Sequence, residues 1–194
     1  GRGRWHFSDE AVHADAVSRL TIEDELRGSI GTSEFVVHYQ PVMRLVDGEV
    51  IEYEALVRWR HPMRGLLPPA DFLPMAEDCG LIVQMDAQVL DLVCADMAAR
   101  LVALPRVAVN VSGVELARPD FASRVMTTLE RHLVDPSRLI LEVTETAVAR
   151  DMSRAIASLH ALRGAGFKLA LDDFGTGLSS FGYLKHFPVD YLKI

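Results

Sequence analysis

The chain has 194 residues, of which 49% are hydrophobic and 24% are charged, a composition typical of a globular protein with one core. Its net charge of −7 argues against a nucleic-acid binder, which would present a basic surface. An anionic small ligand remains compatible with this charge if a metal cation supplies positive charge. No apolar run approaches the roughly 20 residues that span a bilayer. The two cysteines form no CxxC motif, so we expect core thiols in a cytoplasmic protein that makes no membrane contact through this segment.

Residues 8–30 predict a helix that begins at Ser8, a good N-cap, and ends before Gly31. Its apolar stripe is thin for a core helix. We therefore interpret residues 1–33 as a connector from an upstream signalling domain. The alternative is a packing helix at the edge of the domain.

Short β-rich runs then alternate with helical patterns. The predicted strands are residues 35–42, 49–59, 106–112, 138–145, 167–174 and 191–194. The predicted helices are residues 69–81, 85–101, 121–133 and 149–166. This alternation predicts crossover units and a largely parallel sheet, hence an α/β fold. The first two strands are separated only by a short stretch that contains Asp47-Gly48, which predicts an antiparallel hairpin.

Polar side chains recur near the carboxyl ends of the predicted strands, where functional groups of such sheets project. In chain order they are Glu54, Asn110, Glu142, Glu145, Asp172, Asp173 and Lys193. Helix capping explains one such residue but not the series. Oxygen ligands without histidine or cysteine favour Mg²⁺ or Mn²⁺ over zinc. A metal would also compensate the repulsion between Asp172 and Asp173, either with each acid on its own ion or with one acid on the metal and the other on a water.

Six motifs follow one another in a specific order: "HYQPV", "YEALVRWRHP", "GLLPPADFLPMAEDCGLI", "VNVS", "LEVTET" and "DDFGTGLSSFGYLKHFPVDYLKI". From residue 34 to residue 194 the chain resembles the EAL family of cyclic di-GMP phosphodiesterases. The resemblance implies a modified TIM (β/α)₈ barrel with an antiparallel first strand, of which about the first six strands are present. It also implies hydrolysis of cyclic di-GMP to linear pGpG with Mg²⁺ or Mn²⁺ as cofactor.

The resemblance further implies roles for single residues. The metal ligands would be Glu54, Asn110, Glu142, Asp172 and Asp173, and the catalytic set Lys193, Asp173 and Glu54. Asp173 would hold a second metal or the attacking water, which Lys193 would position or deprotonate. Gln40 and Arg58 would contact the dinucleotide, Arg58 by forking onto a phosphate, and Glu145 would tether the glycine-rich loop. Plainer alternatives are an ion pair for Glu145, rim packing for Arg58 and an ordinary surface position for Lys193.

Compared with the family, the chain stops inside the sixth strand, whereas a complete barrel takes about 250 residues. We interpret residues 34–194 as a C-terminally incomplete EAL domain that lacks a late glutamate and a late glutamine of the family. Three explanations compete: an ordered part of a longer protein, a truncated protein that pairs its open edge with a second copy, or a short inactive protein. We expect a homodimer, and we expect these residues alone to hydrolyse cyclic di-GMP poorly or not at all.

Three functions compete. The leading one is the phosphodiesterase, with an upstream partner domain of GGDEF type because "GRGRWHF" loosely resembles a GGDEF–EAL junction. The second is an inactive EAL module that binds cyclic di-GMP or a protein as a signalling receptor. The third is an unrelated metal-dependent barrel enzyme such as an aldolase. The intact set of metal-site positions favours the first.

Overall fold

The structure is a computed structural model that describes residues 21–99, 106–175 and 187–194. These residues form one seven-stranded sheet with the order β1-β2-β4-β5-β6-β7 and with β3 paired to β2. The strands are β1 (Phe35–Met43), β2 (Val50–His61), β3 (Gly65–Leu67), β4 (Val107–Asn110), β5 (Leu139–Thr144), β6 (Lys168–Asp172) and β7 (Tyr191–Leu192). The α-helices are α2 (Leu73–Asp78), α3 (Ile82–Ala98), α4 (Gly113–Leu116), α5 (Phe121–His132), α6 (Glu145–Arg150) and α7 (Met152–Gly164). Two 3₁₀ turns, Pro69–Asp71 and Pro136–Arg138, complete the order.

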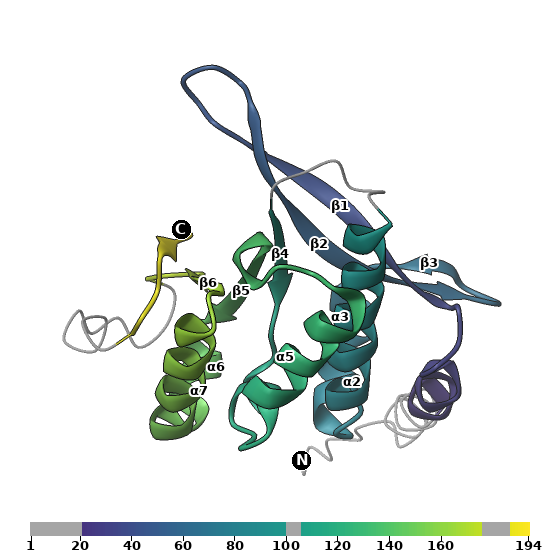
Figure 1. The fold of residues 1–194 in the computed structure, drawn as a ribbon. Helices are drawn as coiled ribbons and strands as arrows, with labels where there is room; N and C mark the ends of the chain where they lie inside the picture. Colours follow the sequence, from purple (N-terminus) through teal and green to yellow (C-terminus); the bar gives the residue numbers. More distant parts are fainter. Residues whose placement is uncertain (1–20, 100–105, 176–186) are drawn as a thin grey trace, which may run out of the picture.

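The sheet topology agrees with the predicted α/β fold. β1 and β2 pair antiparallel, and the pairs from β2 through β4, β5 and β6 to β7 are parallel. The hairpin predicted from Asp47-Gly48 is confirmed: Gly48 has φ +72° and its amide donates to the carbonyl of Arg44 at 2.8 Å. This long hairpin extends beyond the other strands (Figure 1). The short strand β3, antiparallel to β2, was missed because three residues carry no periodic signal.

Several predicted boundaries are wrong. Residues 149–166 are not one helix, because the side chain of Asp151 accepts from the amide of Arg154 and starts α7 separately from α6. The pattern over 69–81 becomes a 3₁₀ turn followed by the short α2. The last predicted strand, 191–194, is reduced to β7.

The first predicted helix is described only from residue 21 onward. Residues 21–29 are helical, and Gly31, with φ +80°, follows the helix end as predicted. Leu26 is fully buried, and Glu34 accepts hydrogen bonds from Ser29 Oγ (2.7 Å) and Trp59 Nε1 (3.0 Å). The described part of this helix therefore packs onto β2, and its role as a connector stays a prediction. None of the described helices has the length and apolar character needed to cross a membrane.

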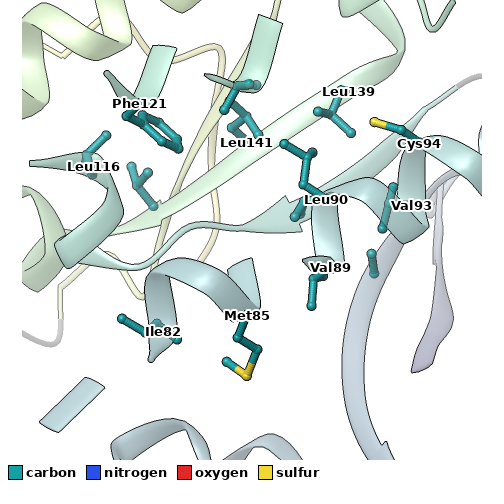
Figure 2. Packing of buried hydrophobic residues seen from close by; sticks show 14 of the residues in the cluster. Ile82, Met85, Val89, Leu90, Val93, Cys94, Leu116, Phe121, Leu139 and Leu141 are labelled. Carbon is teal, nitrogen blue, oxygen red and sulfur yellow. The ribbon is translucent and has the colours of Figure 1, made fainter. Parts of the chain in front are cut away.

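The two faces of the sheet carry different residues because side chains alternate along a strand. One face contributes Leu139 and Leu141 to the main core, where α3 packs against them through Leu90 and Val93 (Figure 2). Helices α3 and α5, and α5 and α7, lie side by side over this face (Figure 1). The opposite face carries a smaller buried cluster of Ala108, Ile140 and Ala170, with Tyr191 packed against it. The polar residues of the candidate site share this second face.

Candidate active site

Five of the predicted site residues meet above the small cluster on the second face of the sheet. The ammonium of Lys193 lies 2.7 Å from Glu142 Oε2, 3.1 Å from Glu54 Oε2 and 3.6 Å from Asp172 Oδ2. Asn110 Nδ2 donates to the second oxygen of Glu54 at 3.0 Å. Lys193 and Glu54 are 139 residues apart in the sequence, so this cluster is a product of the tertiary fold.

Strand register explains the convergence. Asn110 pairs directly with Glu142 across β4 and β5, and Thr144 pairs with Asp172 across β5 and β6. Residues paired in register project from the same face of the sheet. Lys193 continues this row after β7, where its amide donates to the carbonyl of Leu171 at 2.9 Å. The backbone thus fixes the relative positions of the carboxylates and the ammonium.

The expectation that these residues end their strands holds only in part. Asn110 and Asp172 are the last residues of β4 and β6. Glu54 instead lies in the interior of β2, because β2 continues to His61 and pairs there with β3. Glu142 also lies inside its strand, β5.

The cluster places three carboxylates around one ammonium, and one of the carboxylates is almost completely buried. Glu142 is only 1% exposed, and this burial raises the pKa of its carboxyl to about 7, opposed by Lys193 and reinforced by Glu54 and Asp172. Burial alone would lower the pKa of Lys193, but the hydrogen bonds and charges of Glu142 and Glu54 outweigh it and raise that pKa. Lys193 therefore stays protonated at neutral pH and compensates the buried carboxylate of Glu142 and its partly exposed neighbours.

Asp173 follows β6 in an unusual backbone conformation. Its φ is +53°, in the left-handed region that aspartate tolerates better than most residues. Its amide donates to Asp172 Oδ1 at 2.9 Å. This turn holds the Asp172 carboxylate while the exposed Asp173 lies beside it.

Gln40 and Arg58 lie on the hairpin next to the cluster. Gln40 pairs directly with Glu54 across β1 and β2, so both project from one face. Arg58 shares that face because it lies four positions after Glu54 on the same strand, and side chains alternate between faces along a strand. Its guanidinium donates to the carbonyl of Val57 at 2.8 Å. The structure therefore places both predicted ligand-contacting residues on the side of β2 that carries Glu54.

Glu145 is the first residue of α6 and directly follows β5. Its Oε2 atom is buried and has no hydrogen-bond partner in the part of the chain that the structure describes. The glycine-rich loop that it was predicted to tether lies largely at residues 176–186, outside the described residues. The tether therefore stays a prediction.

The chemistry of the donors fits a hard divalent cation. Carboxylate and amide oxygens are the ligands that Mg²⁺ and Mn²⁺ prefer, and the nearly inaccessible carboxylate of Glu142 requires a positive charge beside it. Across residues 21–99, 106–175 and 187–194, however, no group of three or more His, Cys, Asp or Glu side chains is arranged to hold a metal directly. In this arrangement the shared cation is the ammonium of Lys193.

A cavity of about 490 Å³ adjoins the cluster at Asn110. Residues of β2, α2, α3 and α6 contribute to its walls. Its lining includes Leu56, Val57, Glu77, Asp86, Asn110, Ser112 and Arg150. The sequence predictions did not include Asp86, which lies within the helix predicted for residues 85–101. The available signal was an acid placed between Met85 and Val89, both of which are buried.

Asp86 should make stability depend on pH. Burial raises the pKa of its carboxyl to about 7 against the opposing hydrogen bond from Ser112. In the unfolded chain this carboxyl ionises near 3.8, so folding is penalised increasingly as pH rises from about 4 to 7. Asp86→Asn should therefore match the wild type near pH 4 and be about 2–4 kcal/mol more stable at pH 8. Urea unfolding across this range measures the difference; equal pH profiles would contradict the assignment.

Comparison with known proteins identifies the class. Residues 23–194 match the family model described as "EAL domain", and the chain belongs to the EAL domain family. The bifunctional diguanylate cyclase/cyclic di-GMP phosphodiesterase MucR of Pseudomonas aeruginosa is 41% identical over 197 residues, covering 100% of this chain and 29% of MucR. The cyclic di-GMP phosphodiesterase NbdA of the same organism is also 41% identical, with 100% of this chain and 25% of NbdA covered.

Solved structures agree with this membership. The P. aeruginosa MucR phosphodiesterase in complex with c-di-GMP has 42% identity and a TM-score of 0.84, covering 90% of this chain and 72% of that chain. The Xanthomonas citri FimX EAL domain in complex with c-diGMP has 26% identity and a TM-score of 0.81, covering 94% and 72%. The predicted EAL-type α/β fold is confirmed. The chain spans only about a quarter to under a third of the length of the curated relatives it matches.

Proposed function

We propose that this chain is a divalent-metal-dependent phosphodiesterase domain that hydrolyses cyclic di-GMP to linear pGpG. The observation that carries the proposal is the meeting of Glu54, Glu142 and Asp172 around Lys193, with Asn110 alongside. MucR and NbdA, both named as cyclic di-GMP phosphodiesterases, support it. Phosphodiesterases of this family generally depend on divalent metal ions, and we infer Mg²⁺ or Mn²⁺ from the oxygen donors.

The residues of this chain divide the work. Glu54, Asn110, Glu142 and Asp172 would hold the cations, and Asp173 would hold a second cation or the water. When bound, such cations supply an activated water and neutralise the charge that builds on the phosphate oxygens. Lys193 would contact the water and orient it through an N–H donor. Proton removal would fall to a carboxylate such as Asp173.

The ligand would lie between the carboxylate cluster and the adjoining cavity, on the side where Asn110 belongs to both. Gln40 and Arg58 on the hairpin would contact it, since both share the face of Glu54. A planar guanidinium suits a phosphate because it can donate two parallel hydrogen bonds. The cavity of about 490 Å³ beside Asn110 is large enough for one nucleoside portion of a dinucleotide.

Purified full-length protein that carries this domain should produce pGpG from cyclic di-GMP in the presence of Mn²⁺, measured by chromatography, and a chelator should stop the reaction; residues 1–194 alone are still expected to produce little or none. Glu54→Gln should lower the rate by at least about tenfold, since it removes a charged ligand. Glu49→Gln, an exposed glutamate on the same hairpin that pairs with Arg44, should not. Equal rates for the two variants would remove Glu54 from the mechanism. Binding of cyclic di-GMP without turnover would point instead to a receptor.

The partner predictions extend this proposal. MucR combines a diguanylate cyclase with its phosphodiesterase, which supports an upstream GGDEF-type domain joined through the helix that ends at Ser29. A homodimer also stays a prediction, and sedimentation of the purified protein would test it.

A further inference from the structure

Lys193 occupies the position where the carboxylates of the proposed metal site converge. We propose that its ammonium is a resident counter-cation: it holds Glu54, Glu142 and Asp172 together in the metal-free protein and competes with a divalent cation for their oxygens. This inference rests on the proposed function, because it takes those three residues as metal ligands.

The contacts of the ammonium are the ones a metal would need. Its nitrogen lies 2.7, 3.1 and 3.6 Å from one oxygen each of Glu142, Glu54 and Asp172. A divalent ion on the same oxygens would lie a few ångströms from Nζ, where two like charges repel strongly in poorly solvated surroundings. The ion and the ammonium therefore cannot share these oxygens, and when the ion binds, the ammonium would give up the carboxylates and donate to the neighbouring water instead.

The surroundings of Lys193 allow it to serve as a removable cation. Its backbone is held on both sides, since its amide donates to the carbonyl of Leu171 and its carbonyl accepts from Phe174 at 3.1 Å. Its side chain is nevertheless 29% exposed, and a lysine has a flexible four-carbon stem. The ammonium can therefore move off the carboxylates and toward the water position while the main chain stays in register.

The metal-free site would be unstable without this charge. Glu142 is 1% exposed, and breaking a buried ion pair leaves an uncompensated charge that is strongly destabilising. Lys193 thus keeps the ligands assembled before a metal arrives, at the expense of metal affinity. Its removal should have opposite effects on these two properties.

Lys168 provides a matched control. It pairs with Asp190 at 3.0 Å and is 36% exposed, similar to Lys193. It also lies on β6, the strand that carries Asp172, but its carboxylate partner is not among the proposed ligands. Lys168→Met therefore removes a comparable ion pair without touching the proposed site.

The test compares the wild type with Lys193→Met, Lys193→Gln and Lys168→Met. Titration calorimetry gives the Kd for Mn²⁺, and calorimetric melting in chelator gives the metal-free Tm. Both Lys193 variants should bind Mn²⁺ at least about tenfold more tightly than the wild type. Their metal-free Tm should fall by about 4 °C or more. Lys168→Met should leave the Kd unchanged within error, although its Tm can also fall.

The outcomes separate this inference from the proposed function. If Lys193→Met does not fold, Lys193→Gln, which keeps hydrogen-bond donors near the carboxylates, decides the comparison. Unchanged or weaker Mn²⁺ binding by the folded Lys193 variants, with hydrolysis by the wild type intact, overturns the counter-cation alone. A failure of all four proteins to bind Mn²⁺, together with no hydrolysis, overturns both.

Discussion

Glu142→Gln should reduce metal-dependent hydrolysis of cyclic di-GMP by at least about a hundredfold. Replacing a residue that only hydrogen-bonds to a metal ligand can already lower metal affinity or activity by up to about a hundredfold. The physical reason is that the amide keeps the shape of the side chain but loses the negative charge. Glu142 makes the shortest of the three carboxylate contacts with Lys193, at 2.7 Å. The rate of pGpG formation under saturating Mn²⁺ measures the loss.

The same change should not destabilise the fold at pH 8. Burial raises the pKa of Glu142 to about 7 from an ordinary 4.5, so folding is penalised as pH rises through this window and the full penalty applies above it. Glutamine removes the penalty and, at the same time, the ion pair with Lys193, so the two effects oppose each other. Thermal melting at pH 8 should show a Tm equal to or above that of the wild type.

Glu115→Gln is the matched control for Glu142→Gln. Glu115 is as buried, with 2% exposure, but it lies on α4 and pairs with Arg124. Its replacement should leave the hydrolysis rate of the folded protein unchanged. A large loss of rate in Glu115→Gln, or none in Glu142→Gln, would show that the cluster around Lys193 is not the catalytic centre.

Arg124→Ala should destabilise the protein by about 3 kcal/mol or more, the cost of leaving a buried carboxylate without its partner. Arg124 donates to both oxygens of Glu115, at 2.8 and 3.3 Å. Arg118 lies 3.8 Å from the same carboxylate and can compensate only in part. Urea unfolding at pH 7.5 gives the free energy of unfolding directly.

A surface pair supplies the comparison. Arg131 bonds to the exposed Asp91 at 2.6 Å, and exposed ion pairs contribute at most about 1 kcal/mol. Arg131→Ala should therefore cost far less than Arg124→Ala. In addition, the double variant Arg124→Ala with Glu115→Gln should be more stable than Arg124→Ala alone, because the unpaired charge is gone. Equal losses for the two single variants would mean that Glu115 is neutral or solvated in the folded protein.

Local signals predicted much of the fold. Alternating β-rich and helical runs predicted the α/β class, and Asp47-Gly48 predicted the hairpin at which Gly48 adopts φ +72°. The predicted helix over 149–166 and the missed strand β3 were wrong for two different local reasons. Asp151 interrupts what reads as one helix because its side chain caps the amide of Arg154, and β3 is too short to produce a periodic pattern.

Charged residues inside the helical layer were not predictable in the same way. Asp86 and Glu115 read as ordinary helical acids, and their surroundings depend on what packs against them. Ser112 donates its amide to Asp86 at 3.3 Å, and Arg124 reaches Glu115 from the next helix. Neither partner is fixed by periodicity, because side-chain partners across elements depend on how the helices pack.

The sequence by itself determined which residues are available for chemistry: acids and an amide at or near strand ends, and motifs specific enough to indicate the EAL family. Only the tertiary structure decided how they are combined. Glu54 and Lys193, 139 residues apart, meet because four parallel pairings carry the register from β2 to β7. A shift of one residue in any of these pairings would turn a ligand to the opposite face. The presence of a protonated lysine among the carboxylates is therefore a property of strand register, which no local pattern encodes.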